Sequence, residues 1–142
     1  MRALGLDLGS RRIGVAVSDS GGRLATPIET VQRTNDRPSE HRALAALVAE
    51  WEVEIVVVGV PYSLDGSIGP MALLMLKEAK QLGATLGVPV ETYDERLTTV
   101  TAERSMREQG LKGKADRQVV DQIAAAVMLQ AWLDSQQNQE ER

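Results

Sequence analysis

The sequence predicts an α/β protein in which helices cover both faces of a mixed five-stranded sheet, with three antiparallel strands followed by two parallel ones. Residues 2–9 and 12–19 alternate apolar side chains with small or polar ones across a short turn, which indicates an antiparallel hairpin. Residues 54–60, EIVVVGV, form an unbroken β-branched run that is typical of a parallel strand buried on both faces. Helical segments flank this run, as right-handed βαβ crossovers require.

The first three expected strands follow one another closely. The first carries leucines on one face and small residues with one acid on the other: Leu4, Leu6 and Leu8 against Gly5, Asp7 and Gly9. The segment DSGGR, residues 19–23, is a turn signal that leads to a third strand at about residues 24–32. Because Pro27 cannot donate to a β-ladder, we expect this third strand at an edge of the sheet.

The rest of the chain alternates between helices and strands. Pro70 occupies the first position of one of these helices, where proline is well tolerated. The expected elements are a helix at 39–51, a strand at 54–60, a loop at 61–69, a helix at 70–83, a strand at 88–93, and helices at 98–109 and 117–133.

Length and composition narrow the class of protein. A chain of 142 residues is long enough for one core, and we expect a single domain at residues 1–134 with a disordered polar tail at 135–142. The absence of cysteine excludes thiolate chemistry, and a single histidine, His41, argues against a histidine-rich metal site or a Ser/His/Asp triad. No apolar run approaches the roughly 18 residues of a membrane span, and the chain enters a strand at once, without a signal peptide. We therefore expect a cytoplasmic protein with no membrane partner.

Basic residues are unevenly distributed in a chain whose net charge is −4. The overall balance argues against a protein that coats nucleic acid nonspecifically. The segment 104–117 nevertheless has five basic residues against two acids, and Arg11 and Arg12 form a second basic point. Each cluster is either solvated surface or a place where nucleic-acid phosphates bind.

Asp7 lies in the middle of the first strand, where a carboxylate is unusual. Its neighbours on the same face, Gly5 and Gly9, leave space above it for a ligand or another backbone. Burying this charge requires a partner or a metal ion. We favour a functional role over the alternative, an ion pair with an arginine such as Arg12.

Glu95 follows the carboxyl end of a parallel strand, in the segment YDERLTT. Open α/β sheets bind their ligands at that end of the strands. Taken alone, the alternative is stronger: residues 94–96 form a polar loop, and Thr98 or Thr99 caps the next helix.

Asp121 heads an apolar stripe on the last expected helix. Ala124, Ala125, Met128 and Trp132 follow it at helical spacing, so its side chain is expected to face the core. The alternative, equally open, is an acid stabilised by the N-terminus of the helix, an interaction of about 0.3–1 kcal/mol.

Together the three acids suggest more than each does alone. Carboxylates from the first strand, the end of the fifth strand and a late helix can converge on one site. Mg²⁺ and Mn²⁺ prefer such oxygen ligands. Two of these ions about 4 Å apart activate a water and stabilise the leaving oxygen of a phosphodiester.

Four segments carry a resemblance to a known family: GLDLGSRRIGVAVSD, VVVGVPYSLDG, DERLTT and VDQIAAAVMLQAWL. In this order they resemble the YqgF (RuvX) family of bacterial proteins with an RNase H-like fold, over residues 1–133. The resemblance implies a metal-dependent nuclease that uses Mg²⁺ or Mn²⁺, with two ions. It also implies a role in the 5′ maturation of precursor 16S rRNA in the cytoplasm, or a Holliday-junction resolvase-like activity.

Carried over by position, the resemblance places the family's three site acids on Asp7, Glu95 and Asp121, as catalytic residues and metal ligands. The chain departs from the family pattern at Val60, where leucine is expected, in SLDG, and at Thr101, where glutamate is common. The segment LKGKADRQ is also less basic than the family pattern, which predicts a weaker electrostatic contribution to substrate affinity.

Several polar residues are expected to contact the substrate, and some have a structural alternative. For Ser10, Arg11 and Arg12 a plain hairpin turn is equally open, and for Tyr62 and Asp65 we favour an ordinary turn. Asp116 ranks second to Asp121 as a site acid. The expected substrate-binding residues are Ser10, Arg11, Arg12, Arg96, Lys112, Lys114 and Arg117.

Three other functions compete with RNA cleavage. Resolution of branched DNA needs two symmetric cuts and therefore a homodimer with two-fold symmetry. A non-catalytic ribosome-assembly or nucleic-acid-binding factor would tolerate asparagine at all three acids. The Asp-x-Gly hairpin also resembles the phosphate loop of actin-like ATPases and sugar kinases, but these need a second lobe for which this chain is too short.

Overall fold

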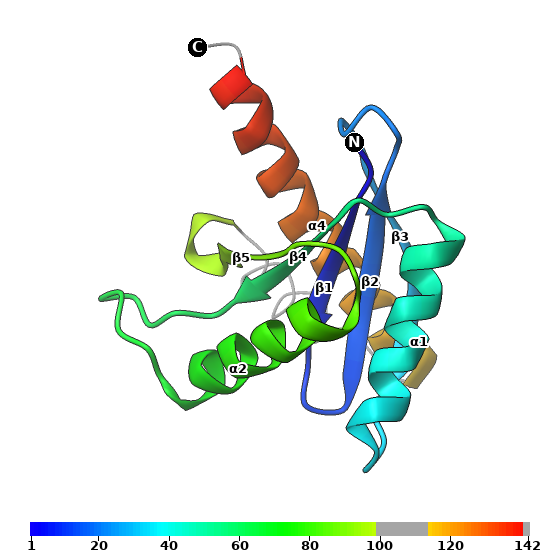
Figure 1. Ribbon diagram of the computed structural model, residues 1–142. Helices are drawn as coiled ribbons and strands as arrows, with labels where there is room; N and C mark the ends of the chain where they lie inside the picture. The colour runs from blue at the N-terminus through cyan, green and yellow to red at the C-terminus, as the bar shows by residue number, and fades with distance from the viewer. Residues whose placement is uncertain (99–113, 141–142) are drawn as a thin grey trace.

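The computed structural model describes residues 1–98 and 114–140 of the chain. Its elements follow the expected alternation (Figure 1). They are β1 (Ala3–Leu8), β2 (Arg12–Ser18), β3 (Ala25–Gln32), α1 (Arg37–Glu50), β4 (Ile55–Val60), α2 (Pro70–Thr85), β5 (Val90–Asp94), the short 3₁₀ helix η1 (Glu95–Leu97) and α4 (Lys114–Glu140).

The strands form a five-stranded mixed sheet in the order β3-β2-β1-β4-β5. β2 pairs antiparallel with β1 and β3, whereas β4 pairs parallel with β1 and β5. This confirms the predicted sheet and the edge position of the third strand. Pro27 pairs with Ala16 beside a register irregularity in β2, where the missing donor is tolerated.

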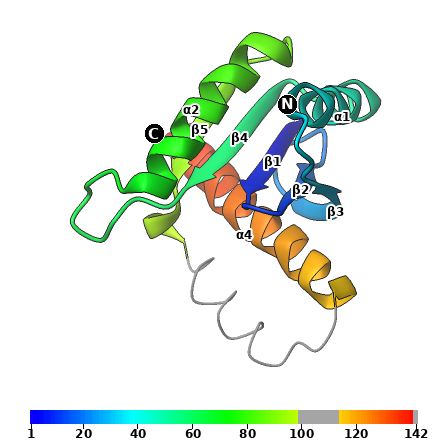
Figure 2. The same ribbon diagram turned by 90° about the horizontal axis from the view of Figure 1, so that it is seen from below.

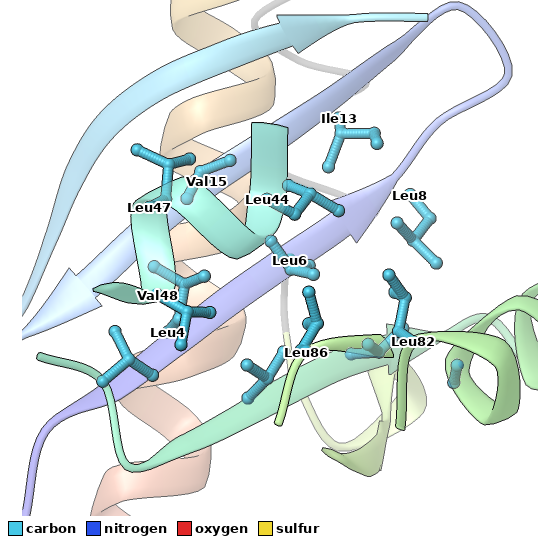
Figure 3. Close-up of a cluster of buried hydrophobic side chains, with 14 of the residues drawn as sticks. Leu4, Leu6, Leu8, Ile13, Val15, Leu44, Leu47, Val48, Leu82 and Leu86 are labelled. Atoms are coloured by element: carbon cyan, nitrogen blue, oxygen red, sulfur yellow. The ribbon is translucent and has the colours of Figure 1, made fainter. Parts of the chain in front are cut away.

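The helices cover both faces of the sheet, as predicted. α1 and α2 lie on one face and α4 crosses the other (Figures 1 and 2). On the α1 and α2 face, alternate residues of β1 and β2 pack against leucines of both helices (Figure 3). The buried residues of this cluster include Leu4, Leu6, Leu8, Ile13 and Val15 from the strands and Leu44, Leu47, Leu82 and Leu86 from or beside the helices.

Small residues on the opposite face allow α4 to approach the sheet closely. A Cβ atom on Gly14 would lie 2.1 Å from the backbone oxygen of Asp121, and one on Gly5 would lie 2.8 Å from Leu129 Cβ. Ala124 and Ala125 of α4 are buried in the same interface. The two glycines therefore set the distance at which α4, and with it Asp121, sits above β1 and β2.

A buried arginine ties the β1–β2 turn to both helices of the other face. Arg33, with a side chain only 8% exposed, donates through Nε to the carbonyl of Gly9 at 2.9 Å. Its guanidinium also binds Glu40 at 3.1 Å and Glu78 at 2.9 Å. Its backbone N–H donates to the carbonyl of Arg11 at 2.9 Å. The turn that follows Asp7 is thus fixed from below by α1 and α2.

Glu78 remains ionised in this network. Burial alone would raise its pKa, but hydrogen bonds from Arg33, Arg37 and His41 outweigh burial and lower the pKa to about 2. Arg37 and His41 lie 2.5 Å and 3.1 Å from the carboxylate. The buried charge is therefore compensated at every pH at which the protein would be studied.

The ends of several helices differ from the sequence prediction. α1 begins at Arg37 because the side chain of Asp36 caps it by accepting from Ser39 N. α4 runs from Lys114 to Glu140, so residues 135–140, expected in a disordered tail, are helical. Polar side chains of this segment have partners: Gln137 donates to the carbonyl of Gly22 at 3.2 Å. The helix expected at 98–109 lies, from residue 99 onward, outside the described residues.

The domain boundary at residue 134 stays a prediction.

Within the part of the chain that the structure describes, no helix combines the length and apolar character needed to cross a bilayer.

We predict that Gly14→Ala destabilises the protein by about 1–3 kcal/mol or more, because the added methyl group collides with the backbone of α4. The free energy of unfolding in urea measures the loss. Gly21→Ala is the matched control, since its nearest neighbour would be 3.8 Å away. Equal stability of the two variants would show that α4 does not pack on β2 as described.

Candidate active site

A pocket of about 460 Å³ opens near the carboxyl end of β1. Figure 2 shows the ends of β1 and β4 between α2 and α4. All three predicted site acids line this pocket, together with the β1–β2 turn. The lining residues are Asp7, Leu8, Gly9, Ser10, Arg11, Arg12, Pro61, Met71, Met75, Glu95 and Asp121.

Asp7 reaches the pocket from the central strand of the sheet. It is 5% exposed and pairs across the β1–β2 ladder with Gly14. The side chains on its face of β1 are small, because Ala3 and Gly5 lie beneath α4. Because β1 is the central strand and is paired on both sides, the backbone of Asp7 is held in a fixed position within the site.

Glu95 reaches the same pocket from the other side, as the first residue of η1 directly after β5. It is 9% exposed and packs above Gly59 of β4, where a Cβ atom would lie 2.7 Å from its Oε1. Burial, and to a lesser extent the charge of Asp94, raise the pKa of Glu95. Among the described residues no basic side chain forms an ion pair with it. The site therefore holds a carboxylate whose charge is poorly compensated.

Asp121 lies in the interior of α4 and forms an ion pair with Arg12, with Nε and Oδ2 2.6 Å apart. Both side chains are largely buried, 14% exposed for Asp121 and 19% for Arg12. Because α4 begins at Lys114, Asp121 is about two turns from the helix start, and stabilisation by the helix N-terminus does not explain its position. The pairing with Arg12 that the sequence analysis considered for Asp7 is made by Asp121.

The donor set fits a hard divalent cation in its chemistry. Three carboxylates line one pocket, and the buried Glu95 gains from a positive charge beside it. As the side chains stand, no three acidic or histidine residues within the described ranges are close enough to hold a metal ion. Arg12 meanwhile holds one carboxylate oxygen of Asp121. A cation held by Asp121 would have to compete with Arg12 for that carboxylate.

The predicted substrate-binding residues fall into two groups. Ser10, Arg11 and Arg12 line the pocket, whereas Arg96 and Arg117 do not. Arg117 is exposed. Lys112 lies outside the described residues, as do the side chains of Lys114 and Asp116.

Arg96 makes a local contact instead. Its guanidinium binds Asp94 at 2.5 Å, lowering the pKa of that carboxyl group, and donates to the carbonyl of Leu64 at 3.3 Å. It also lies 5.8 Å from the ring centre of Tyr62. Arg96 thus fastens the loop after β4 to the end of β5. Within that loop Asp65 accepts from Ser67 N, as expected for a turn.

Several residues at or behind the pocket are not among the predicted site residues. Pro61, Met71 and Met75 line the pocket, and Met71 and Met75 bring the first turns of α2 against it. Glu78 and Arg33 hold the β1–β2 turn from behind. Glu78 shares a helical stripe with buried apolar residues, the same signal that singled out Asp121.

The mixed sheet with two helices on one face and a long helix on the other defines an RNase H-like α/β fold, with an acid on its central strand. The chain belongs to the RuvX family, whose model, described as Holliday junction resolvase, matches residues 1–135. This confirms the family resemblance.

Known proteins resemble the chain over nearly its whole length. A protein of Mycobacterium ulcerans is 51% identical over 135 residues, 94% of this chain and 78% of that relative. One of Crocosphaera subtropica is 46% identical over 132 residues, 93% of this chain and 92% of the relative. Both are named "Putative pre-16S rRNA nuclease". The structure of Thermus thermophilus RuvC with a Holliday junction substrate has a TM-score of 0.57 at 18% identity, covering 96% of each chain, and shows the shared fold.

We predict that Glu95→Gln stabilises the metal-free protein at pH 7 by about 0.5–2 kcal/mol. The raised pKa of Glu95 means that its ionised form destabilises the folded state above that pKa, and that this penalty is absent below the unfolded pKa. The gain should therefore disappear when urea unfolding of chelator-treated protein is repeated below about pH 4. Glu29→Gln, at an exposed position of β3, serves as the control. A destabilised Glu95→Gln variant would contradict this electrostatic account.

Proposed function

We propose that this chain is a nuclease that depends on Mg²⁺ or Mn²⁺, with two ions, and that hydrolyses phosphodiester bonds in the 5′ maturation of precursor 16S rRNA in the cytoplasm. One observation carries the proposal. Carboxylates that are far apart in the sequence, Asp7, Glu95 and Asp121, line one pocket beside a basic turn. The names of the relatives support the RNA substrate.

Asp7, Glu95 and Asp121 would hold the ions. When bound, divalent cations neutralise phosphate charge and lower the pKa of a water molecule. The residues of this chain supply the rest. Asp7 gives a ligand from a rigid strand, and Glu95 is buried, so its charge favours cation uptake. Ser10 and Arg11 stand at the pocket, where they can contact the phosphate.

Arg12 has a double role in this proposal. Without a cation, its guanidinium compensates the partly buried charge of Asp121. If Asp121 held a cation instead, the guanidinium would be available at the pocket wall, where a substrate phosphate would be a suitable bidentate partner. Arg12 would thus exchange a carboxylate for a phosphate.

Cleavage of branched DNA is the second candidate, because the matching family model is described as Holliday junction resolvase. It requires a two-fold dimer that presents two pockets to one junction. A protein that remains monomeric with and without junction DNA argues against it. A non-catalytic role in ribosome assembly is the remaining alternative, and the next experiment excludes or supports it.

We predict that Asp7→Asn reduces cleavage of a precursor 16S rRNA fragment by about 100-fold or more, because it removes a charged ligand from the centre of the site. The rate is measured with purified protein and Mn²⁺, beside the same assay on a four-way DNA junction. Asp19→Asn changes an exposed acid of the β2–β3 turn and controls for general effects of charge. Undiminished cleavage by Asp7→Asn would remove the proposed mechanism.

We also predict that Arg12→Gln binds Mn²⁺ about 5- to 10-fold more tightly than the parent protein. The substitution removes both a competitor for Asp121 and a positive charge beside the cation, and a 5- to 10-fold change corresponds to about 1–1.4 kcal/mol of binding free energy. Isothermal titration calorimetry measures the affinity. Arg23→Gln, at an exposed arginine of the β2–β3 turn, is the matched control. Weaker binding would mean that Arg12 orients Asp121 for the cation instead of competing with it.

A further inference from the structure

A second hollow, of about 430 Å³, lies next to the candidate active site, and we name it the flanking groove. It shares part of its wall with the first pocket, through Leu8, Gly9, Ser10, Met71 and Met75. Its remaining lining residues are Arg33, Arg37, Leu74, Lys77, Glu78 and Gln81. A bound polymer that extends from the active-site pocket past Ser10 would therefore enter this groove directly.

The flanking groove is basic in a chain that is acidic overall. The described residues of its lining include three that are basic and one that is acidic, whereas the whole chain has a net charge of −4. Arg33 and Glu78 compensate each other beneath the surface, with side chains 8% and 7% exposed. Arg37 is 54% exposed although it also contacts Glu78, and Lys77 is exposed on α2. The accessible charge of the groove is thus positive.

The other wall of the groove is apolar. Leu74 is 60% exposed and Met71 is 47% exposed, beside the buried Leu8 and Met75. Such side chains can cover a ribose or the face of a base, whereas cations beside them bind phosphate. Among the described residues that line the groove none is aromatic, so these residues offer no ring on which a base could stack. The lining suits a nucleotide chain held mainly by its backbone.

We propose that the flanking groove binds the single-stranded nucleotides on one side of the scissile phosphate, with Lys77 and Arg37 contacting backbone phosphates. This inference rests on the proposed function and specifies where the substrate leaves the site. Groove and pocket together form a continuous path along the start of α2. Neither Lys77 nor Arg37 is among the residues that the sequence analysis assigned to the substrate.

Lys77 and Lys80 provide a matched pair for the test. Both are exposed lysines of α2, but Lys80 lines a separate hollow beside Val90 and Thr92 of β5. Lys77→Gln and Lys80→Gln are each made in the Asp7→Asn background, so that the RNA is not cut. Fluorescence anisotropy then measures binding to a blunt RNA hairpin and to the same hairpin with a single-stranded extension of about 12 nucleotides at its 5′ or its 3′ end.

We expect Lys77→Gln to weaken binding of one extended hairpin by about 3- to 10-fold and to reduce the salt dependence by about 0.7 in the logarithmic slope, the value for one phosphate contact on a single strand. The blunt hairpin should bind equally to all variants. Lys80→Gln should bind every RNA as tightly as the Asp7→Asn protein without a second substitution. If Lys77→Gln weakens binding of the 5′-extended hairpin, the groove holds the 5′ strand. If it weakens binding of the 3′-extended hairpin, the groove holds the 3′ strand.

Two results would overturn the inference while leaving the nuclease proposal intact. One is equal binding of the extended hairpins by Lys77→Gln and Lys80→Gln. The other is an equal loss on blunt and extended hairpins, which would place Lys77 against the duplex. If the parent protein binds none of the RNAs, the proposed RNA substrate itself fails, and with it the groove.

Discussion

The close contact between α4 and the glycines of the sheet is the constraint on which the site depends. Gly14 has no side chain because the backbone of Asp121 occupies that space. Gly59 leaves room in the same way for the carboxylate of Glu95. Asp7 lies on the strand between them, paired with Gly14. The three acids therefore line one pocket because the sheet has glycines beneath them. Larger residues at Gly14 and Gly59 would push Asp121 and Glu95 away.

The β1–β2 turn connects this constraint with the other face of the molecule. On one side Arg33 holds the carbonyl of Gly9 and is itself held by Glu78 of α2. On the other side Arg12 reaches across to Asp121 of α4. The turn is thus fixed by ionic contacts to helices on both faces of the sheet.

Local pattern sufficed to predict the sheet, and it marked Asp7 and Asp121 as unusually placed acids. For Glu95 it favoured a polar loop, and only the combination of three acids and the family resemblance made Glu95 a site candidate. Alternation placed Asp7 opposite the leucine face, and helical spacing directed Asp121 toward the core, where both are found. The ion pair between Arg12 and Asp121 joins residues 109 positions apart, so no local pattern reveals it. The contact between Arg96 and Asp94 is local by contrast, because the two residues are only two positions apart. A role of Arg96 in substrate binding stays a prediction.

The distribution of charge explains how an acidic chain can serve a polyanionic substrate. Part of its negative charge is neutralised by buried ion pairs, because Glu40 and Glu78 both contact Arg33. Arg12 compensates the charge of Asp121, whereas burial raises the pKa of Glu95, so the pocket holds negative charge that a bound divalent cation would offset. The net charge of −4 therefore says little about the β1–β2 turn and the flanking groove, where basic side chains gather.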